Sequence, residues 1–181
     1  MAIFMEIVYH KLRVRELTPE LFDSFRRFQQ VEKCWRKIEG RWALQNIAFT
    51  EDWNAGDYQR LCGQLSRDVR EGGTVWGAFS SGDLKGFASV EGRLIGSRGQ
   101  YAVLAELHVS EECRRKGIGR GLFGLAAGSA RERGAEKLYI SAMSAEESQA
   151  FYREMGCVEA VEADPYHVQM EPCDVQMEYL L

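Results

Sequence analysis

The chain has 181 residues, of which 45% are hydrophobic and only three are proline. This length and composition predict one compact domain over residues 1–181 and exclude a disordered or fibrous chain. The net charge of −4 argues against a broad surface for nucleic acids or anionic membranes, so neither is an expected partner.

The cysteines and the apolar runs indicate where the protein resides. Its five cysteines are widely spread, with no CxxC pair and no histidine at a metal-ligand spacing, so we expect free thiols and no metal site. No apolar run has the length of a membrane-spanning helix, and the first residues do not resemble a signal peptide. The prediction is a cytoplasmic protein.

The first part of the chain predicts a strand and two helices. Apolar and charged residues alternate over residues 11–16, which indicates a strand. Thr18 and Pro19 then favour a helix start, and apolar residues follow at helical spacing up to Phe28. A second helix is predicted over residues 57–71, because its apolar side chains share one face and two glycines follow it.

The segment between these two helices has no clear period. Residues 29–54 carry four aromatic side chains, Trp35, Trp42, Phe49 and Trp53. A partly buried loop or a short hairpin fits this composition. A wall of the acceptor pocket fits as well, because long irregular segments often carry function.

The remainder of the sequence alternates strands and helices. Strands are expected over residues 74–79, 85–90, 100–109 and 137–142, with a hairpin turn at 80–83. Helices are expected over residues 117–134 and from a capping box at Ser144 to Gly156. Two last strands are expected near 157–161 and 175–181. The whole predicts a mixed α/β domain.

A basic, glycine-containing loop precedes the helix at 117–134. Four of the seven residues from Arg114 to Arg120 are basic. The start of a helix presents unpaired N–H groups and positive potential, and Gly117 and Gly119 permit close approach of a ligand. These features predict a site for a pyrophosphate or a similar polyanion. A solvated basic turn that caps the helix is the alternative.

Two other nucleotide-binding motifs do not fit this loop. The Gly-Lys-Ser/Thr triplet of a phosphate-binding loop does not occur in the sequence. Gly119–Gly124 matches G-x-G-x-x-G, but residues 110–116 separate it from the strand, whereas a dinucleotide fold has its glycines directly after the strand. The acidic residue expected in such a fold is also missing from residues 139–141.

The loop resembles the [QR]-x-x-G-x-[GA] signature of the GNAT superfamily of N-acetyltransferases, with Arg114, Gly117 and Gly119 at the defined positions. Residues 150–157, Ala-Phe-Tyr-Arg-Glu-Met-Gly-Cys, resemble the family's F-Y-x-x-x-G-F element, with Cys157 in place of the usual phenylalanine. An asparagine often found early in the last helix is missing. The resemblance implies a single-domain fold with a mixed central sheet of about six to seven strands and about four flanking helices.

The resemblance also implies a reaction and a binding site. The reaction is transfer of an acetyl group from acetyl-coenzyme A to a primary amine by direct attack in a ternary complex, with no metal. The coenzyme would lie against two short segments, formed by Leu107, His108 and Val109 and by Arg114, Arg115, Lys116, Gly117, Ile118, Gly119 and Arg120. A non-catalytic acyl-coenzyme A sensor or regulatory module is the alternative function.

Two residues are candidate catalytic groups. Glu106 lies near the expected thioester and is the candidate base, because a free amine with a pKa of about 10.4 must lose a proton before it attacks. The alternative for Glu106 is an ion-paired strand carboxylate. His108 shares its face of the strand unless a bulge intervenes, and is more typical of a hydrogen-bonded structural histidine. Tyr152 occupies the family's position for the acid that protonates the leaving thiolate, or else it only packs beside Phe151.

The acceptor stays open at this level, between a small molecule and a protein amine. The acidic balance favours a cationic acceptor such as a polyamine, an aminoglycoside or a protein lysine. The acids considered for this role are Glu146, Glu147, Glu159, Glu162 and Asp164. A monomer and a homodimer both fit the sequence.

Overall fold

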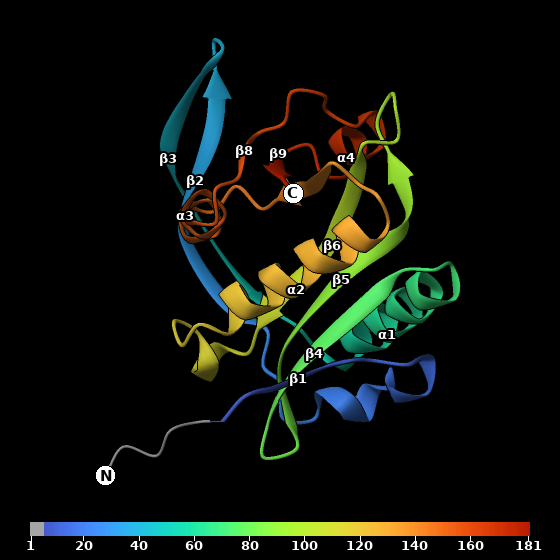
Figure 1. The fold of residues 1–181 in the computed structure, drawn as a ribbon. Coiled ribbons are helices and arrows are strands. Elements are labelled where there is room, and N and C mark those ends of the chain that lie inside the picture. Colours follow the sequence, from blue (N-terminus) through green and yellow to red (C-terminus); the bar gives the residue numbers. More distant parts are fainter. Residues whose placement is uncertain (1–5) are drawn as a thin grey trace.

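A seven-stranded mixed sheet forms the centre of the computed structural model, which describes residues 6–181 (Figure 1). Its strands lie in the order β1-β4-β5-β6-β7-β9-β8. In that order they span Val8–Lys11, Thr74–Ser80, Asp83–Ile95, Tyr101–Val109, Lys137–Ala142, Val175–Leu180 and Val158–Glu159. A separate two-stranded sheet pairs β2 (Phe28–Ile38) with β3 (Arg41–Asp52).

Residues 6–181 also form four α-helices and three short 3₁₀-helices. The α-helices are α1 (Ala55–Arg70), α2 (Ile118–Glu132), α3 (Glu146–Glu154) and α4 (Pro165–Met170). The 3₁₀-helices are Val14–Glu16, Pro19–Phe22 and Glu111–Cys113. The predicted α/β architecture is therefore confirmed. Within the same residues, no helix has both the length and the apolar character needed to cross a lipid bilayer.

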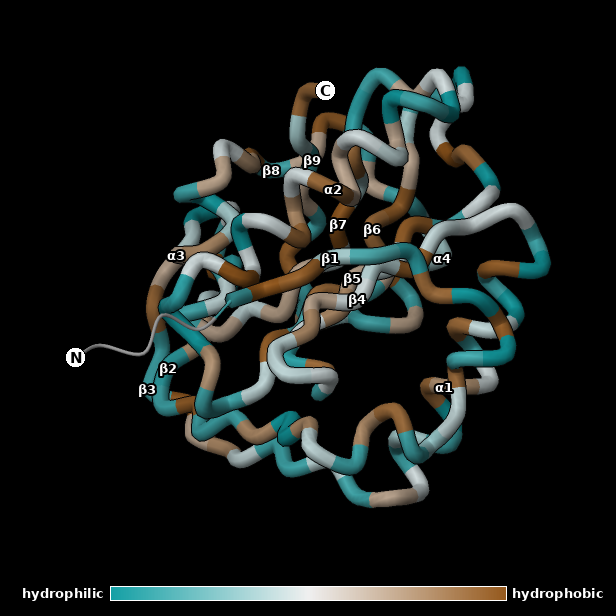
Figure 2. The backbone as a smooth tube through the Cα atoms, turned by 60° about the horizontal axis from the view of Figure 1, so that its bottom comes forward, coloured by the Kyte–Doolittle hydropathy of each residue, from teal (hydrophilic) through white to brown (hydrophobic). Residues whose placement is uncertain are grey.

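Helices α1 and α2 cover opposite faces of the sheet. Ala88 and Leu104 belong to the core beneath α2, whereas Val75 and Phe87 belong to the core beneath α1. Successive strand residues point to opposite faces, so the neighbours Phe87 and Ala88 serve the two cores in turn. Figure 2 shows the two helices on either side of strands β4 and β5, with hydrophobic residues concentrated in the central strands.

The prediction for the N-terminal part was wrong in two places. The strand predicted over residues 11–16 ends at Lys11 as β1, and a 3₁₀-turn follows it. The helix predicted after Pro19 is a single 3₁₀-turn, Pro19–Phe22. Phe22 and Phe25 are instead buried beneath α1 and pack edge to face, with ring centroids 5.9 Å apart. Their spacing in the sequence reflects this tertiary contact, although it resembles a helical period.

The unassigned segment over residues 29–54 is a long hairpin, which projects beyond the sheet beside α3 (Figure 1). Its turn has positive φ at both Glu39 (49°) and Gly40 (79°), the conformation that favours a tight hairpin. The hairpin is fixed to the segment before α3 by a backbone bridge between Cys34 and Ala145. This segment is therefore positioned to form a wall of the site described below.

Helices α3 and α4 also differ from expectation. The capping box predicted at Ser144 is absent, because the N-cap of α3 is Ala145 and Ser144 Oγ instead accepts a hydrogen bond from Arg36 Nη1 at 2.6 Å. Helix α4 was missed, although Asp164 and Pro165 are a typical N-cap and first-turn pair. The other predicted elements are confirmed with shifts of boundary, the largest in β5 and β8.

Helix α1 begins with a reciprocal cap. Asn54 Oδ1 accepts the N–H of Gly56 at 2.8 Å and that of Asp57 at 3.2 Å. Asp57 Oδ2 in turn accepts the N–H of Asn54 at 2.8 Å. Three donors at the start of this helix are therefore satisfied by two side chains.

We expect Asn54→Ala to lower the free energy of unfolding by about 1 kcal/mol, because the Gly56 N–H loses its acceptor and the Asp57 N–H keeps only the Asn54 backbone oxygen. Urea unfolding followed by circular dichroism measures this change. Asn46→Ala is the matched control, because Asn46 is exposed on β3. Equal losses of stability in the two variants would contradict the capping role.

Candidate active site

Strands β6 and β7 run parallel and then separate. Within residues 6–181, only Tyr101–Val103 of β6 pairs with β7, at Lys137–Tyr139. β6 continues to Val109, while β7 continues to Ala142 paired with β9 on its other side. The backbone of residues 104–109 therefore has one edge without a strand partner. Such an edge is open to pairing with an extended ligand.

An extra residue in β6 lies where the two strands begin to separate. In the register with β5, Glu106 is opposite Ser89 and Leu104 is opposite Val90, so Ala105 has no partner and forms a bulge. Leu104 points into the core beneath α2. The bulge reverses the alternation that follows it, so Glu106 and His108 point to the face covered by α1.

The loop before α2 presents a row of backbone donors. The six consecutive N–H groups of residues 115–120 donate to no backbone acceptor in the described part of the chain. The first backbone bond of α2 runs from the Gly121 N–H to the Gly117 oxygen, at 3.0 Å. No side chain caps the helix, and positive φ at Arg115 (60°) and Gly117 (84°) gives the loop its curvature. This geometry is typical of an anion site.

The basic side chains of the loop have different roles. Arg114 points inward, where its Nε donates to the Val109 oxygen at 3.3 Å and its Nη2 donates to the Phe28 oxygen. Lys116 Nζ donates to the Glu112 oxygen at 2.9 Å, and Arg120 pairs with Glu154 at 2.6 Å. Arg115 is exposed. Arg114 thus anchors the loop, and the remaining positive charges lie near the open donors.

The second helix of the predicted motif packs against this loop. A Cβ atom at Gly119 would lie 3.3 Å from the Phe151 ring, so glycine lets the ring approach the first turn of α2. Tyr152, the next residue on α3, is partly buried. Burial raises the pKa of its phenol, and Cys157, Glu106 and Asp174 act in the same direction. The phenol is therefore protonated at neutral pH and able to donate. Burial also raises the pKa of the Cys157 thiol, to about 12.

A chain of four polar side chains ends at Glu106. His108 Nε2 lies 2.6 Å from Glu106 Oε2, and His108 Nδ1 lies 3.0 Å from Arg27 Nε. Because an arginine Nε–H only donates, Nδ1 must accept and Nε2 carries the proton that is shared with Glu106. Arg27 Nη2 donates in turn to Glu51 Oε2 at 2.7 Å. The other Glu106 oxygen, Oε1, is 3.5 Å from Gln64 Nε2.

Arg27 is the buried centre of this chain, with 5% of its surface exposed. Its Nη1 has no hydrogen-bond partner among residues 6–181. Trp53 contacts both Arg27, whose Cζ is 5.5 Å from the ring centroid, and the edge of His108. Arg27 and Glu51 were not predicted from the sequence, because neither belongs to a motif. The aromatic content of residues 29–54 was the available signal, and Trp53 carries it.

The strand residues assigned to the coenzyme divide between the two faces. Leu107 and Val109 pack against the core beneath α2, so only their backbone reaches the open edge of β6. His108 points to the opposite face, where it contacts Arg27 and Glu106. The expectation that Glu106 and His108 share a face holds, because the bulge precedes both residues.

Two further carboxyl groups have raised pKa values. Asp68 is on α1, and burial raises its pKa to about 6, with Glu91 and Glu106 acting in the same direction. Asp174 precedes β9, and burial followed by the charge of Glu171 raises its pKa to about 6. Carboxyl groups with raised pKa values gather at functional sites more often than elsewhere.

The acids singled out from the sequence mostly have partners elsewhere. Glu159 pairs with Lys37 at 2.7 Å, and Glu162 accepts from Ser97 Oγ at 2.9 Å. Asp164 caps α4 and lies 2.7 Å from His167 Nδ1. Glu146 and Glu147 are exposed at the start of α3. The carboxyl groups whose pKa values burial raises are instead Asp68, Glu91 and Asp174, which the sequence did not distinguish.

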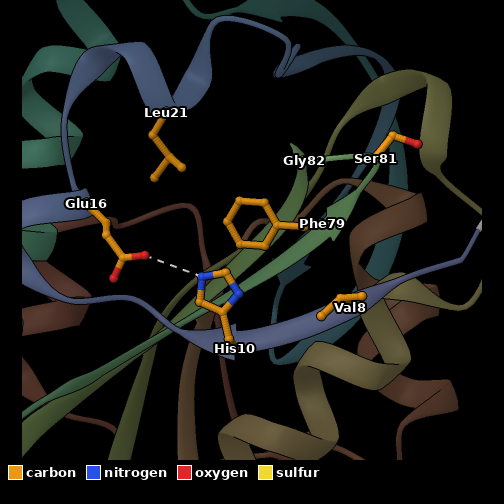
Figure 3. A pocket seen from close by; sticks show the side chains of 7 residues that line it. All are labelled: Val8, His10, Glu16, Leu21, Phe79, Ser81 and Gly82. Atoms are coloured by element: carbon orange, nitrogen blue, oxygen red, sulfur yellow. Dashed lines mark ion pairs between the residues drawn. The ribbon is translucent and has the colours of Figure 1, made fainter.

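The pocket drawn in Figure 3 is separate from this site. Seven residues line it: Val8, His10, Glu16, Leu21, Phe79, Ser81 and Gly82. The His10 ring stacks on Phe79 with centroids 4.5 Å apart, and His10 Nε2 lies 3.5 Å from Glu16 Oε1. None of these residues belongs to the loop before α2 or to the polar chain that ends at Glu106, so we assign no substrate to this pocket.

The acetyltransferase (GNAT) family matches residues 38–157, a range that includes the loop, the open edge of β6 and Tyr152. The chain belongs to the GNAT acetyltransferase family. Membership confirms the predicted family and makes the protein an acetyl-coenzyme A-dependent N-acetyltransferase. No curated protein matches the chain significantly in sequence.

Solved structures similar to this GNAT protein extend over almost its whole length. A nourseothricin acetyltransferase is 19% identical, with a TM-score of 0.69 over 96% of this chain and 98% of the other. A protein of Bacillus anthracis str. Ames assigned as a streptothricin acetyltransferase, in complex with acetyl coenzyme A, is 13% identical, with a TM-score of 0.70 over 98% of both chains. The PaiA N-acetyltransferase of Thermoplasma acidophilum, in complex with coenzyme A, is 16% identical, with a TM-score of 0.62 over 98% of this chain and 100% of the other. The TM-scores establish a common fold.

The raised pKa of Asp68 makes stability depend on pH. The folded protein keeps a proton on this carboxyl up to about pH 6, whereas the ordinary pKa of an aspartate is 3.8. The folded state therefore binds more protons between these values, and stability falls as pH rises through this window.

We expect Asp68→Asn, which has no proton to lose, to increase the free energy of unfolding at pH 7 by about 1–2 kcal/mol. The gain over the unmodified protein shrinks as pH falls from 7 toward 4. Thermal unfolding of both proteins across this range measures the difference. Asp83→Asn is the control, because Asp83 is exposed at the start of β5. A gain that does not change with pH would show that the charge of Asp68 is not its cause.

Proposed function

We propose that the protein transfers the acetyl group of acetyl-coenzyme A to a primary amine, which attacks directly within a ternary complex. The observation that carries this proposal is the row of six open N–H groups at residues 115–120, next to the open edge of β6. A pyrophosphate fits the N–H row, and an extended arm with amide groups fits the strand edge. Coenzyme A has both groups in one molecule.

Glu106 is the proposed general base. One of its oxygens is held by His108 Nε2 at 2.6 Å, whereas the other has only a long contact with Gln64. The second oxygen is therefore available to take a proton from the ammonium group of the acceptor, directly or through water. Arg27 holds His108 in the tautomer that donates to Glu106. We regard Arg27 and His108 as positioning residues.

Tyr152 is the proposed acid, and the backbone of β6 is the proposed hydrogen-bond donor to the thioester carbonyl. An N–H on the open edge of residues 104–109 would polarise the thioester carbonyl. As the new N–C bond forms and the C–S bond breaks, the Tyr152 hydroxyl gives its proton to the departing sulfur. The phenol keeps its proton at neutral pH and therefore has a proton to give.

We expect acetyl-coenzyme A and coenzyme A to stabilise the protein against heat, and ATP and NAD to leave it unchanged. A ligand at about 100 times its dissociation constant adds about 2.7 kcal/mol. For a chain of this size that corresponds to a rise of about 5–10 °C in the midpoint. Differential scanning fluorimetry measures the shift. Stabilisation by ATP or NAD, without a shift for coenzyme A, would overturn the assigned ligand.

Tyr152→Phe and Glu106→Gln are each expected to lower kcat on the order of 100-fold, because each removes one proton transfer. Thiol release from acetyl-coenzyme A measures the rate, with the best acceptor from a screen of monoamines, diamines, aminoglycosides and lysine peptides. Tyr166→Phe is the matched control, because Tyr166 is 64% exposed on α4.

Both variants should keep the stabilisation by acetyl-coenzyme A, which separates a lost reaction from a lost fold. Full rates in both would remove Tyr152 and Glu106 from the mechanism. Stabilisation of the unmodified protein without turnover of any amine would favour the acyl-coenzyme A sensor.

A further inference from the structure

Ser89 carries a buried hydroxyl on the central strand β5. It has no exposed surface, and its Oγ has no hydrogen-bond partner within residues 6–181. The strand registers place Ser89 between Val75 of β4 and Glu106 of β6. Residues directly opposite each other in antiparallel strands share a face, and Val75 packs beneath α1. The Ser89 hydroxyl therefore points to the α1 side, on the face that carries the Glu106 carboxylate.

Asp68 reaches the same layer from α1. It lies three residues after Leu65, which belongs to the same buried cluster as Val75, so Asp68 continues the sheet-facing side of the helix. Its Oδ2 is shielded from solvent and accepts no hydrogen bond from the described residues. Two buried oxygens, Asp68 Oδ2 and Ser89 Oγ, are thus left without a donor. Such unsatisfied groups are rare in folded proteins and call for an explanation.

Glu91 adds a second carboxylate to this layer. It lies two residues after Ser89 on β5, so it points to the same face. Its own pKa is raised by burial, and its charge is the largest electrostatic influence on Asp68. The other charges that act on Asp68 are those of Glu106, Glu71 and one cation, Arg67, which is exposed on α1. On Glu91 itself, His167 opposes the effect of burial, whereas Asp164 and Glu71 add to it. Acidic groups therefore outnumber Arg67 and His167 around Asp68 and Glu91.

The chemistry of these groups points to an ammonium ion. A protonated amine supplies three N–H donors and one positive charge, which match two donor-less oxygens and two carboxylates. A metal ion fits less well, because residues 6–181 contain no group of three metal-ligating side chains arranged around one point.

We propose that Asp68, Ser89 and Glu91 form an ammonium subsite, and that the acceptor is a linear diamine or polyamine. One amine would lose its proton to Glu106 and react, while a second, still charged, would lie in the ammonium subsite. Glu91 is two residues beyond the position opposite Glu106, a distance of about 7 Å along the strand, which a short alkyl chain spans. This proposal rests on the function proposed above.

The test compares kcat/KM for 1,5-diaminopentane and n-pentylamine, which have the same chain length and differ by one ammonium group. We expect the unmodified protein to prefer the diamine by at least about tenfold. Asp68→Asn and Glu91→Gln should each reduce this preference several-fold, mainly through KM. Asp68→Glu, which keeps the charge, should retain more of the preference than Asp68→Asn. Glu132→Gln is the control, because Glu132 is exposed and pairs with Lys11 on another part of the surface.

Stabilisation by acetyl-coenzyme A confirms that each variant is folded before its rates are compared. Equal kcat/KM values for the two amines, or an unchanged preference in both Asp68→Asn and Glu91→Gln, would overturn the ammonium subsite while leaving the acetyltransferase proposal intact. Binding of acetyl-coenzyme A without acetylation of either amine would also overturn it. Absence of acetyl-coenzyme A binding would instead contradict the proposed function itself.

Discussion

The bulge at Ala105 determines which side of the sheet carries the chemistry. Strand side chains alternate, so without an extra residue Glu106 and His108 would share the face of Leu104 and enter the apolar core beneath α2. With it, both point toward α1 and meet the Arg27 side chain. The pairing of β6 with β7 ends at Val103, just before the bulge. Residues 104–109 therefore leave a backbone edge of β6 without a strand partner and direct the Glu106 carboxylate to the α1 face of the sheet.

The sequence was informative where the signal is local. The loop from Arg114 to Gly119 combines its charge, its glycines and its place between a strand and a helix within a few residues. The bulge was not predictable, because residues 101–105 form a continuous apolar run in which no polar residue marks a change of face. Arg27 carried no local signal either, since its partner His108 lies 81 positions away. The helix predicted after Pro19 was wrong for a related reason. Phe22 and Phe25 belong to an aromatic cluster assembled by tertiary contacts, and their spacing in the sequence is one that a helix also produces.

The α1 side of the sheet departs from what stability alone favours. A fully buried serine without a partner and carboxyl groups with raised pKa values all oppose folding. Proteins retain such groups at sites where function requires them, and the remaining core supplies the stability that they remove. Here the core is apolar on both faces around β5, with Phe87 and Ala88 completely buried. Ser89 and Asp68 lie in the layer between α1 and the sheet, on the face that carries Glu106, whereas Asp174 lies before β9.

Residues 26–28 connect the two halves of the site. The Arg26 oxygen accepts the Glu111 N–H at 3.0 Å, and the Phe28 oxygen accepts from Arg114, so both residues hold the loop before α2. Arg27, between them, holds His108 and through it Glu106. A shift of the loop around a bound anion must therefore move the peptide that carries Arg27. Binding free energies are reciprocal, so any influence of the first substrate on the second through this tripeptide is returned with equal size.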